Sequence, residues 1–275
     1  MVNPGKVAIM IMSIEEYLKR VGFSGTARAD LETLTKVQEL HVKSVPYENL
    51  EVMARKPLTL DIPSLYEKIV TRGRGGYCFE LNGLFVWLLD GIGFKTIQHF
   101  GRWLRGESLE TPMRRHRVIR VPLDGKEYIC DVGVGMTAPR WPLVFELDAI
   151  QDICGESYRI VRHPVNIYVV EYFSSEGTFK PLYCFNDDPC VPIDYFQAHY
   201  YCTTHPDSIF LNDTMVYIRT ESGHNTIADA YDPFTGEKVT ELRQYENGSL
   251  KTTIIQTKKQ FDEILRKFFG FDTDT

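Results

Sequence analysis

A glycine-rich turn that runs directly into an apolar helical pattern is the feature that most constrains how this chain can fold. The turn is Arg72-Gly73-Arg74-Gly75-Gly76. After it, apolar residues recur at the spacing of one helix face: Leu81, Leu84, Phe85, Leu88 and Leu89. The pattern predicts a helix that begins at or just after Cys78, buries one face in a core and stops at Gly91 and Gly93.

The position of Cys78 at the start of this helix favours a reactive thiol. Unpaired backbone N–H groups and the positive end of the helix dipole both stabilise a thiolate there. Arg72 and Arg74 would act in the same direction. The alternative is a buried cysteine that only packs, as free cysteines usually do. The local pattern leaves these two interpretations evenly balanced.

Composition and charge exclude several classes of protein. The chain has 275 residues, 43% of them hydrophobic and 25% charged, as in ordinary folded proteins with a substantial core. A net charge of −6 argues against a nucleic-acid partner. There is no apolar run of membrane-spanning length, and the run 7–12 is too short for a signal-peptide core. We therefore expect a cytoplasmic protein with no membrane partner.

The cysteines do not form a recognisable disulfide or metal pattern. There are six, at positions 78, 130, 154, 184, 190 and 202, and no Cys-x-x-Cys pair is present. The nearest metal-like grouping is Cys202 with His199 and His205, which lacks a second pair of ligands. We expect reduced thiols and no metal.

The first third of the chain reads as helical. Ser13 and Asp30 are in position to cap two helices, and Pro46 interrupts the pattern after the second. A third helix is expected from about Pro63 up to the glycine-rich turn. The expected buried stripe of the second helix is Leu31, Leu34, Val37 and Leu40.

From Phe94 to about Tyr201 the pattern changes to short strands rich in β-branched and aromatic residues. It predicts a small antiparallel barrel or sandwich. Residues 202–275 mix further strands with a closing helix, for which Thr257 and Gln260 form a capping box. The strands expected in the two parts are 115–122, 126–131, 158–161, 166–172, 178–184, 215–220 and 250–257.

One hairpin places a histidine beside a carboxylate. Asp124-Gly125 is a strong two-residue turn signal, which pairs Leu123 with Lys126 and sets Asp131 opposite Val118. His116 points to the same face as Val118, and such diagonal neighbours lie about 7–8 Å apart at the backbone. A carboxylate at that place would fix the tautomer of the imidazole and raise its basicity. A shift of one residue in the strand register would put His116 and Asp131 on opposite faces of the hairpin.

Taken together, these segments closely resemble the arylamine N-acetyltransferases. Residues 74–82 match the signature Arg-Gly-Gly-x-Cys-x-Glu-x-Asn, and residues 45–50 are similar to the family's Val-Pro-Phe/Tyr-Glu-Asn-Leu. The strand after His116 and the segment 131–135 also match in order and spacing. Weaker similarity continues at 139, 142–143 and 204–210, so the resemblance covers most of the chain.

The resemblance implies an α+β fold of three parts. These are a helical N-terminal domain (1–93), a central antiparallel β-barrel domain (94–201) and a C-terminal α/β lid with the closing helix (202–275). It implies a catalytic triad of Cys78, His116 and Asp131, like that of papain and transglutaminase folds.

The resemblance also implies the reaction. Cys78 would take the acetyl group from acetyl-coenzyme A (acetyl-CoA), a co-substrate, and pass it to an aromatic amine or hydrazine in a ping-pong sequence. His116 would move the protons and Asp131 would orient it.

Substrate-binding residues are less well specified. Tyr47 could line the acceptor pocket or fill core, with equal weight, and Val134 replaces the family's usual phenylalanine, which should open that pocket. Arg114 and Arg115 could meet coenzyme A phosphates or an anionic acceptor such as an aminobenzoate. A solvated strand end is slightly favoured for both. Residues that contact coenzyme A and the oligomeric state cannot be assigned from the sequence.

Arg74 is expected to act structurally, by pairing with Glu48 or Glu80 and locking the loop that presents the cysteine. Two rival functions remain at this stage. One is a hydrolase of the transglutaminase or peptidase type with the same triad, and the other is a binding module that has kept the fold.

Overall fold

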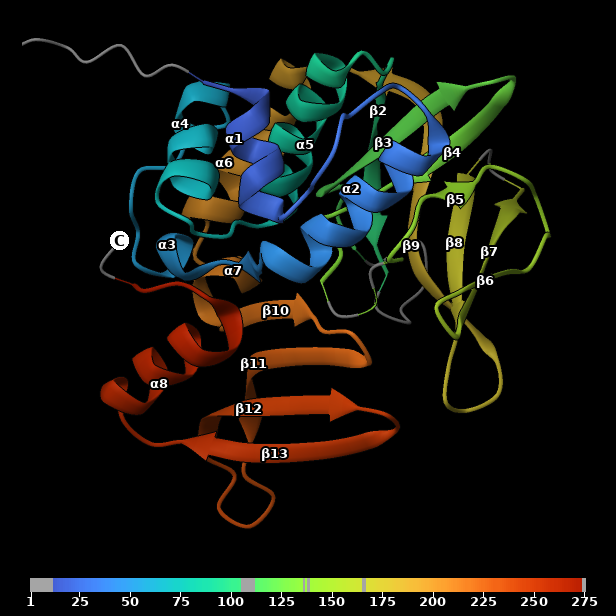
Figure 1. Cartoon of the computed structure of the whole chain (residues 1–275). Helices are drawn as coiled ribbons and strands as arrows, with labels where there is room; N and C mark the ends of the chain where they lie inside the picture. The colour runs from blue at the N-terminus through green and yellow to red at the C-terminus, as the bar shows by residue number, and fades with distance from the viewer. Residues whose placement is uncertain (1–11, 105–111, 136, 138, 165–166, 274–275) are drawn as a thin grey trace, which may run out of the picture.

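The computed structural model describes residues 12–104, 112–135, 137, 139–164 and 167–273. Residues 7–11 of the apolar run 7–12 lie outside these ranges, as does residue 166, the first residue of the strand expected at 166–172. Figure 1 shows three groups of elements: helices gathered above, one large sheet beside them and a second sheet below. The α+β class expected from the sequence is confirmed by this arrangement.

The helices begin where the sequence places their caps. The Ser13 hydroxyl accepts a hydrogen bond from the N–H of Glu16 at 3.2 Å, and the Asp30 carboxylate accepts one from Thr33 at 2.8 Å. The helical group consists of α1 (Ile14–Val21), α2 (Leu31–Ser44), α3 (Leu50–Met53), α4 (Ile62–Tyr66), the π-turn η1 (Glu67–Thr71) and α5 (Cys78–Ile92). None of the helices in the described part of the chain has the length and apolar character needed to cross a membrane.

Helix α5 is the centre of the largest core. Its expected apolar face is fully buried, and the helix ends at Gly93, whereas Gly91 lies inside its last turn. The expected stripe of α2 is wrong at its edges, because Leu31 is 42% exposed while Gln38 and His41 are buried. These two polar side chains can be buried because they find partners, the carbonyl of Pro139 and the hydroxyl of Tyr17 respectively.

The large sheet is antiparallel and has eight strands in the order β5-β4-β3-β2-β9-β8-β7-β6. It curls into a nearly closed barrel, which confirms the first of the two arrangements that the sequence pattern allowed and the one that the resemblance implied. At the seam between the end strands, the amide of Gln151 bonds both the N–H and the carbonyl of Val144. Its strands are β2 (Ile97–Trp103), β3 (His116–Leu123), β4 (Lys126–Cys130), β5 (Leu143–Val144), β6 (Gln151–Ile153), β7 (Glu156–His163), β8 (Ile167–Phe173) and β9 (Phe179–Cys190).

The register of the β3–β4 hairpin is the predicted one. Leu123 pairs with Lys126 and Ile119 pairs with Cys130. Asp131 follows directly after the end of β4 and His116 begins β3. The two side chains therefore meet at the same end of the hairpin.

A helical segment joins the two sheets, where the sequence pattern had predicted strands as far as Tyr201. It contains a short 3₁₀ turn, η2 (Pro192–Tyr195), followed by α6 (Phe196–Thr204) and α7 (Ile209–Asn212). Buried Tyr195 and Cys202 face a second core that also contains Cys78. Tyr195 and Tyr201 pack on this core, whereas Phe196 and Tyr200 are exposed. Tertiary contacts here override the local preference for strands.

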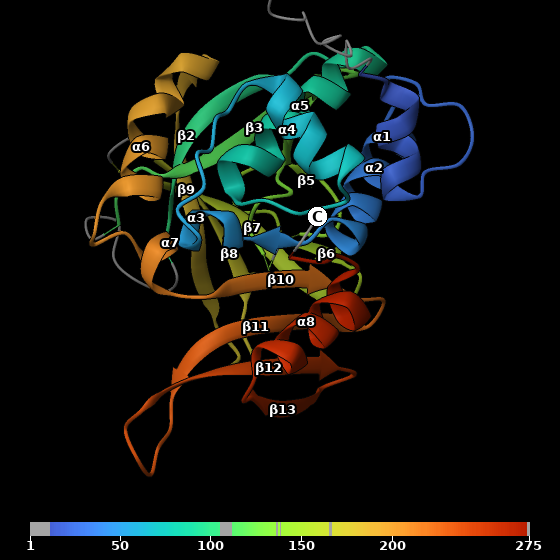
Figure 2. The same cartoon turned by 90° about the vertical axis from the view of Figure 1, so that its left-hand side faces the viewer.

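The second sheet, here called the C-terminal sheet, has the order β1-β10-β11-β12-β13. Figure 2 shows α8 lying across one face of it, and the buried residues of α8 and the following π-turn form one core with the strands. The elements are β1 (Tyr47–Glu48), β10 (Met215–Arg219), β11 (Gly223–Tyr231), β12 (Lys238–Glu246), β13 (Ser249–Ile255), α8 (Lys258–Ile264) and η3 (Leu265–Phe269).

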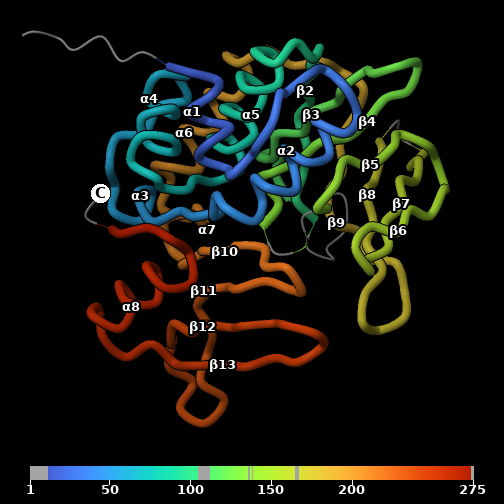
Figure 3. The backbone as a smooth tube through the Cα atoms, viewed as in Figure 1, coloured from blue at the N-terminus to red at the C-terminus, as the bar shows by residue number. Residues whose placement is uncertain are grey.

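The contacts that bind the C-terminal sheet to the helical group include a strand pairing and a packed ring. Strand β1 comes from the helical group, yet it pairs with β10. The chain after η3 runs back toward α3, as Figure 3 shows, and places the buried ring of Phe271 5.0 Å from the guanidinium of Arg74. The end of the chain thus packs on the loop that precedes Cys78.

Candidate active site

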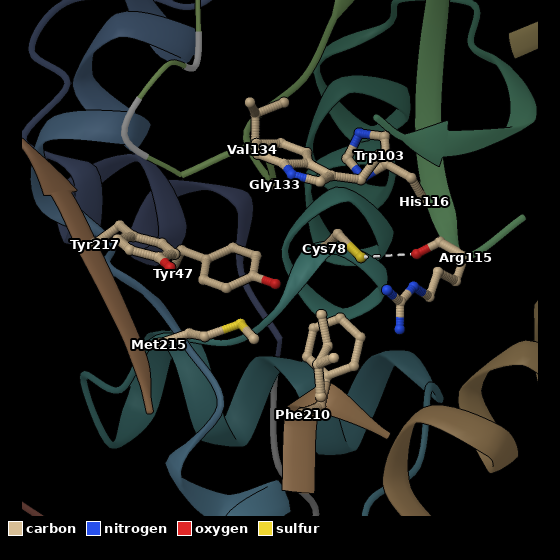
Figure 4. A pocket seen from close by; sticks show the side chains of 11 residues that line it. Tyr47, Cys78, Trp103, Arg115, His116, Gly133, Val134, Phe210, Met215 and Tyr217 are labelled. Atoms are coloured by element: carbon tan, nitrogen blue, oxygen red, sulfur yellow. Dashed lines mark hydrogen bonds between the residues drawn. The ribbon is translucent and has the colours of Figure 1, made fainter. Parts of the chain in front are cut away.

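One pocket is lined by residues from all three groups of elements (Figure 4). The helical group supplies Tyr47 and Cys78, and the C-terminal part supplies four apolar or aromatic side chains. The complete lining is Tyr47, Cys78, Trp103, Arg115, His116, Gly133, Val134, Ile209, Phe210, Met215 and Tyr217. The pocket therefore combines a thiol, an imidazole and walls suited to an aromatic ring.

Cys78 is the first residue of α5 and is only 3% exposed. Its Sγ lies 3.5 Å from the carbonyl oxygen of Arg115, toward which it donates a weak hydrogen bond. This contact joins the start of the helix to the residue just before His116. The nucleophile candidate and the histidine candidate consequently line the same pocket.

The surroundings of Cys78 do not by themselves favour a thiolate, which corrects the expectation from the helix position. Burial raises the pKa of the Cys78 thiol well above its ordinary value, and charges on Cys202 and Asp131 act in the same direction. The N–H of Phe79 and the guanidinium of Arg115 lower this pKa by less. A thiolate therefore requires a base that removes the proton.

The two arginines of the glycine-rich turn form ion pairs with carboxylates. Arg74 binds Glu48 at 2.9 Å, which confirms one of its two expected partners, and Arg72 binds Glu51 at 3.2 Å. Glu80, the other expected partner of Arg74, is paired with Lys68 at 2.8 Å. The arginines thus hold the loop rather than tune the sulfur.

His116 and Asp131 form a buried pair. The Nε2 atom of His116 lies 2.5 Å from Oδ2 of Asp131, and both side chains are almost completely buried. The imidazole is also flanked by the rings of Trp103 and Tyr183. Because Nε2 is hydrogen-bonded to Asp131, Nδ1 is the ring nitrogen that can exchange a proton with another group.

Asn82 orients Asp131, a role that the sequence reading did not assign. Its amide donates to Oδ1 of Asp131 at 2.8 Å and to the carbonyl of Arg117, while its Oδ1 accepts from the N–H of Val132 at 2.9 Å. The N–H of Gly133 also donates to Asp131. Asn82 lies four residues after Cys78 in a predicted helix, so both face the same side, and this spacing could have indicated it.

The glycine-rich turn is fastened to the segment before β1. The N–H of Gly76 donates to the carbonyl of Pro46, and the N–H of Glu48 donates to the carbonyl of Gly76. Glu80 reaches back from the first turn of α5 to the N–H of Tyr77 at 3.0 Å. These bonds fix the entry of the chain into α5 and hence the position of Cys78.

Both residues named for substrate binding line the pocket. Tyr47 is half-buried, with its ring 5.4 Å from that of Tyr217, and Val134 is buried in the wall that bears Gly133. The two arginines before β3 lie in different surroundings. Arg114 is exposed and binds Asn186, as a strand end in water would, whereas Arg115 is half-buried and lines the pocket.

Several wall residues escaped the sequence reading. Trp103 ends β2, and the others come from α7 and β10: Ile209, Phe210, Met215 and Tyr217. The residues of α7 and β10 lie more than a hundred positions from Cys78 in the chain. An apolar residue carries no local signal that distinguishes a pocket wall from a core.

The possible metal grouping around Cys202 is not formed. His199 uses both ring nitrogens, one with the hydroxyl of Tyr77 and one with the carbonyl of Leu58 at 3.1 Å. His205 is exposed on a neighbouring turn. Within the described ranges, no group of three His, Cys, Asp or Glu side chains is arranged to hold a metal ion.

Comparisons with known proteins agree with one another. Residues 30–275 match the model of a family described as N-acetyltransferase. The arylamine N-acetyltransferase of Mycolicibacterium smegmatis is 34% identical over 217 residues, covering 77% of this chain and 78% of that protein. The structure of arylamine N-acetyltransferase from M. tuberculosis matches with a TM-score of 0.86 and 26% identity over 95% of each chain. The enzyme of Mycobacterium marinum in complex with CoA matches with a TM-score of 0.82 and 25% identity, over 94% of this chain and 93% of that one.

Proposed function

The chain belongs to the arylamine N-acetyltransferase family, and from this premise we propose that it moves an acetyl group from acetyl-CoA to an aromatic amine through an acetyl-cysteine at Cys78. The observation that carries the proposal is the meeting of Cys78 with the His116–Asp131 pair in one pocket with aromatic walls. The relative crystallised with CoA supports acetyl-CoA as the donor.

In the first half-reaction, the Nδ1 atom of His116 takes the proton of the Cys78 thiol. The thiolate then attacks the thioester carbonyl of acetyl-CoA, a new C–S bond forms, and the old C–S bond breaks. The leaving coenzyme A thiolate recovers a proton from the imidazolium. Asp131 stabilises the imidazolium while it carries the charge, because its carboxylate lies 2.5 Å from Nε2.

In the second half-reaction, the amine nitrogen attacks the acetyl carbonyl on Cys78. A weakly basic aromatic amine is neutral at pH 7, so it attacks without first losing a proton. His116 then removes the proton from the nitrogen as the C–S bond breaks, and returns it to Cys78. Since coenzyme A leaves before the amine reacts, the proposal requires ping-pong kinetics.

The first test is an intact mass spectrum after brief mixing with acetyl-CoA and no acceptor. One acetyl group is expected on the wild type and none on Cys78→Ala. Cys202→Ala is the matched control, since Cys202 is a buried thiol in the same core as Cys78, and it should still be acetylated. Peptide mapping assigns the adduct among the six thiols.

An aromatic amine or hydrazine added afterwards should remove the acetyl group and release the acetylated amine. Absence of an adduct on Cys78 under these conditions would refute the proposed route. An adduct that water removes as fast as the amine does would point to the hydrolase instead.

A further inference from the structure

Arg115 places a guanidinium in a pocket wall that is otherwise mostly apolar and aromatic. Apart from the His116 imidazole, every other lining side chain is apolar, aromatic or a thiol, and none of the described residues that line the pocket is Asp or Glu. Charged side chains are rarely left in apolar walls without a partner, because removing them from water is costly. The guanidinium therefore needs an explanation.

The side chain of Arg115 is held close to the reacting sulfur. Figure 4 shows the guanidinium near the Cys78 sulfur and facing Phe210, and its central carbon lies 5.6 Å from the centre of that ring. Its positive charge acts on the Cys78 thiol and on Tyr47, which lies across the pocket. Stacking on an aromatic ring leaves the N–H groups at the edge of the guanidinium available.

Three described arginines near Arg115 have hydrogen-bond partners. Arg114 binds the side chain of Asn186, Arg117 binds Gln98, and Arg102 binds the carbonyl of Pro112. Among the residues that the structure describes, no carboxylate, amide or carbonyl binds the guanidinium of Arg115, which instead faces the Phe210 ring. Within the described ranges, the pocket thus holds a cation whose side-chain N–H groups have no hydrogen-bond partner in the protein.

We propose that Arg115 binds a carboxylate on the acceptor, so that this enzyme prefers aromatic amines that carry one, such as aminobenzoates. The inference rests on the proposed acetyl transfer and names its substrate class. A guanidinium binds a carboxylate through two parallel N–H···O bonds, and the pair is stronger in an apolar pocket than in water. The aromatic walls would hold the ring between the carboxylate and the amine.

The position of Arg115 favours the acceptor over the donor. The acetyl group carries no charge, and the phosphates of coenzyme A are separated from the thioester by the whole pantetheine arm. A residue that acts on the Cys78 sulfur and faces Phe210 lies at the reacting end of the donor, away from its phosphates. The other reactant that comes to this end of the pocket is the amine.

The test compares two acceptors of similar size, the anion para-aminobenzoate and the neutral para-aminobenzamide. The readout is the ratio of their kcat/KM values, which in a ping-pong reaction reports the second half-reaction. Effects of Arg115 on thiol ionisation cancel in this ratio. Wild type should prefer the carboxylate, and Arg115→Gln should lower the ratio about 10- to 100-fold, the loss of one charge-assisted pair.

Two variants sharpen the result. Arg115→Lys keeps the charge without the fork and should restore part of the preference. Arg114→Gln is the matched control, because Arg114 is an adjacent arginine outside the pocket, and it should leave the ratio unchanged.

An unchanged ratio in Arg115→Gln would overturn the inference while leaving the acetyltransferase intact, provided the neutral amine is still acetylated. Failure of both amines with wild type would instead refute the proposed function. An Arg115-dependent preference of the first half-reaction for succinyl-CoA over acetyl-CoA, without preference among acceptors, would move the carboxylate to the donor and overturn the assignment.

Discussion

At the scale of single residues, the site depends on a thiol that its surroundings keep protonated. Burial, Cys202 and Asp131 all raise the pKa of Cys78, and the helix N-terminus does not compensate for them. The paired imidazole of His116 lines the same pocket, and we propose that it takes the proton. The reactivity of Cys78 at neutral pH should therefore depend on His116 and not on the helix.

This dependence predicts how alkylation of Cys78 by iodoacetamide varies with pH. The thiolate is the reactive form, and the folded protein raises the thiol pKa above its ordinary value of 9.0. In His116→Gln, the rate should be low at pH 7 and should rise only as the pH passes 9.0. In the wild type, proton transfer to His116 should keep the rate high at neutral pH.

The rates are measured by mass spectrometry of the peptide that contains Cys78. Cys154 is exposed and serves as an internal reference, since its rate should be the same in both proteins. Equal profiles for Cys78 in the wild type and in His116→Gln would show that another group activates the thiol.

The residues of the proposed triad could be selected from the sequence for two physical reasons. A helix start marks Cys78, and a two-residue turn sets the register that brings His116 near Asp131. For Arg114 and Arg115 alike the sequence allows an anionic acceptor as one alternative, but it selects neither Arg115 nor its contact with Phe210. That contact joins segments almost a hundred positions apart, and nothing local states which of two adjacent arginines enters the pocket.

At the scale of elements, the turn before α5 places the nucleophile by close contact of backbones. Gly75 faces the carbonyl of Pro46 so closely that a Cβ atom would lie 2.0 Å from its oxygen. Gly73 in the same turn has φ +68°, but a Cβ atom there would meet no atom within 4 Å. The two glycines are thus required for different reasons.

Replacing each glycine by alanine should separate these reasons. Gly75→Ala forces the turn away from Pro46, so it should lower the free energy of unfolding by about 1–3 kcal/mol and displace Cys78, with a large loss of kcat. Gly73→Ala should cost about 1 kcal/mol for its left-handed backbone and retain kcat. Urea unfolding and steady-state kinetics measure both; similar kcat values in the two variants would contradict the assignment.

Elements were predictable where a local rule sets them. Ser13 and Asp30 cap helices, and Asp124-Gly125 sets a hairpin, because each acts through its own backbone. Helix α6 was misread as strand, since its aromatic residues are compatible with both structures and the packing against Cys78 decides. The pairing of β1 with β10 is of the same kind, because two residues in one segment carry no signal for a strand far along the chain.

At the scale of the whole molecule, the pocket exists only because the C-terminal part closes over the helical group. Asn49 makes the central connection and is 1% exposed. Its amide donates to the carbonyls of Phe210 and Asp213 at 2.9 and 2.8 Å, and its oxygen accepts from the N–H of Met215 at 2.9 Å. Phe210 and Met215 are pocket walls, so one side chain ties the shape of the pocket to the docking of the two parts.

Asn49→Ala should consequently reduce stability and acceptor binding together. Three buried backbone groups lose their partner, which should lower the free energy of unfolding by on the order of 3 kcal/mol. The loosened walls should raise KM for the amine. Acetylation of Cys78 should persist, because the glycine-rich turn and the His116–Asp131 pair do not depend on Asn49.

Asn212→Ala is the control for this change. Asn212 also bonds two carbonyls, those of Pro206 and Ser208, but it is exposed and both bonds stay within one short segment. Its loss should cost less stability and leave KM as it is, because no contact between the two parts is broken. If Asn49→Ala destabilised the protein but KM for the amine stayed at the wild-type value, the pocket walls would be positioned by the C-terminal sheet alone, independently of its docking on the helical group.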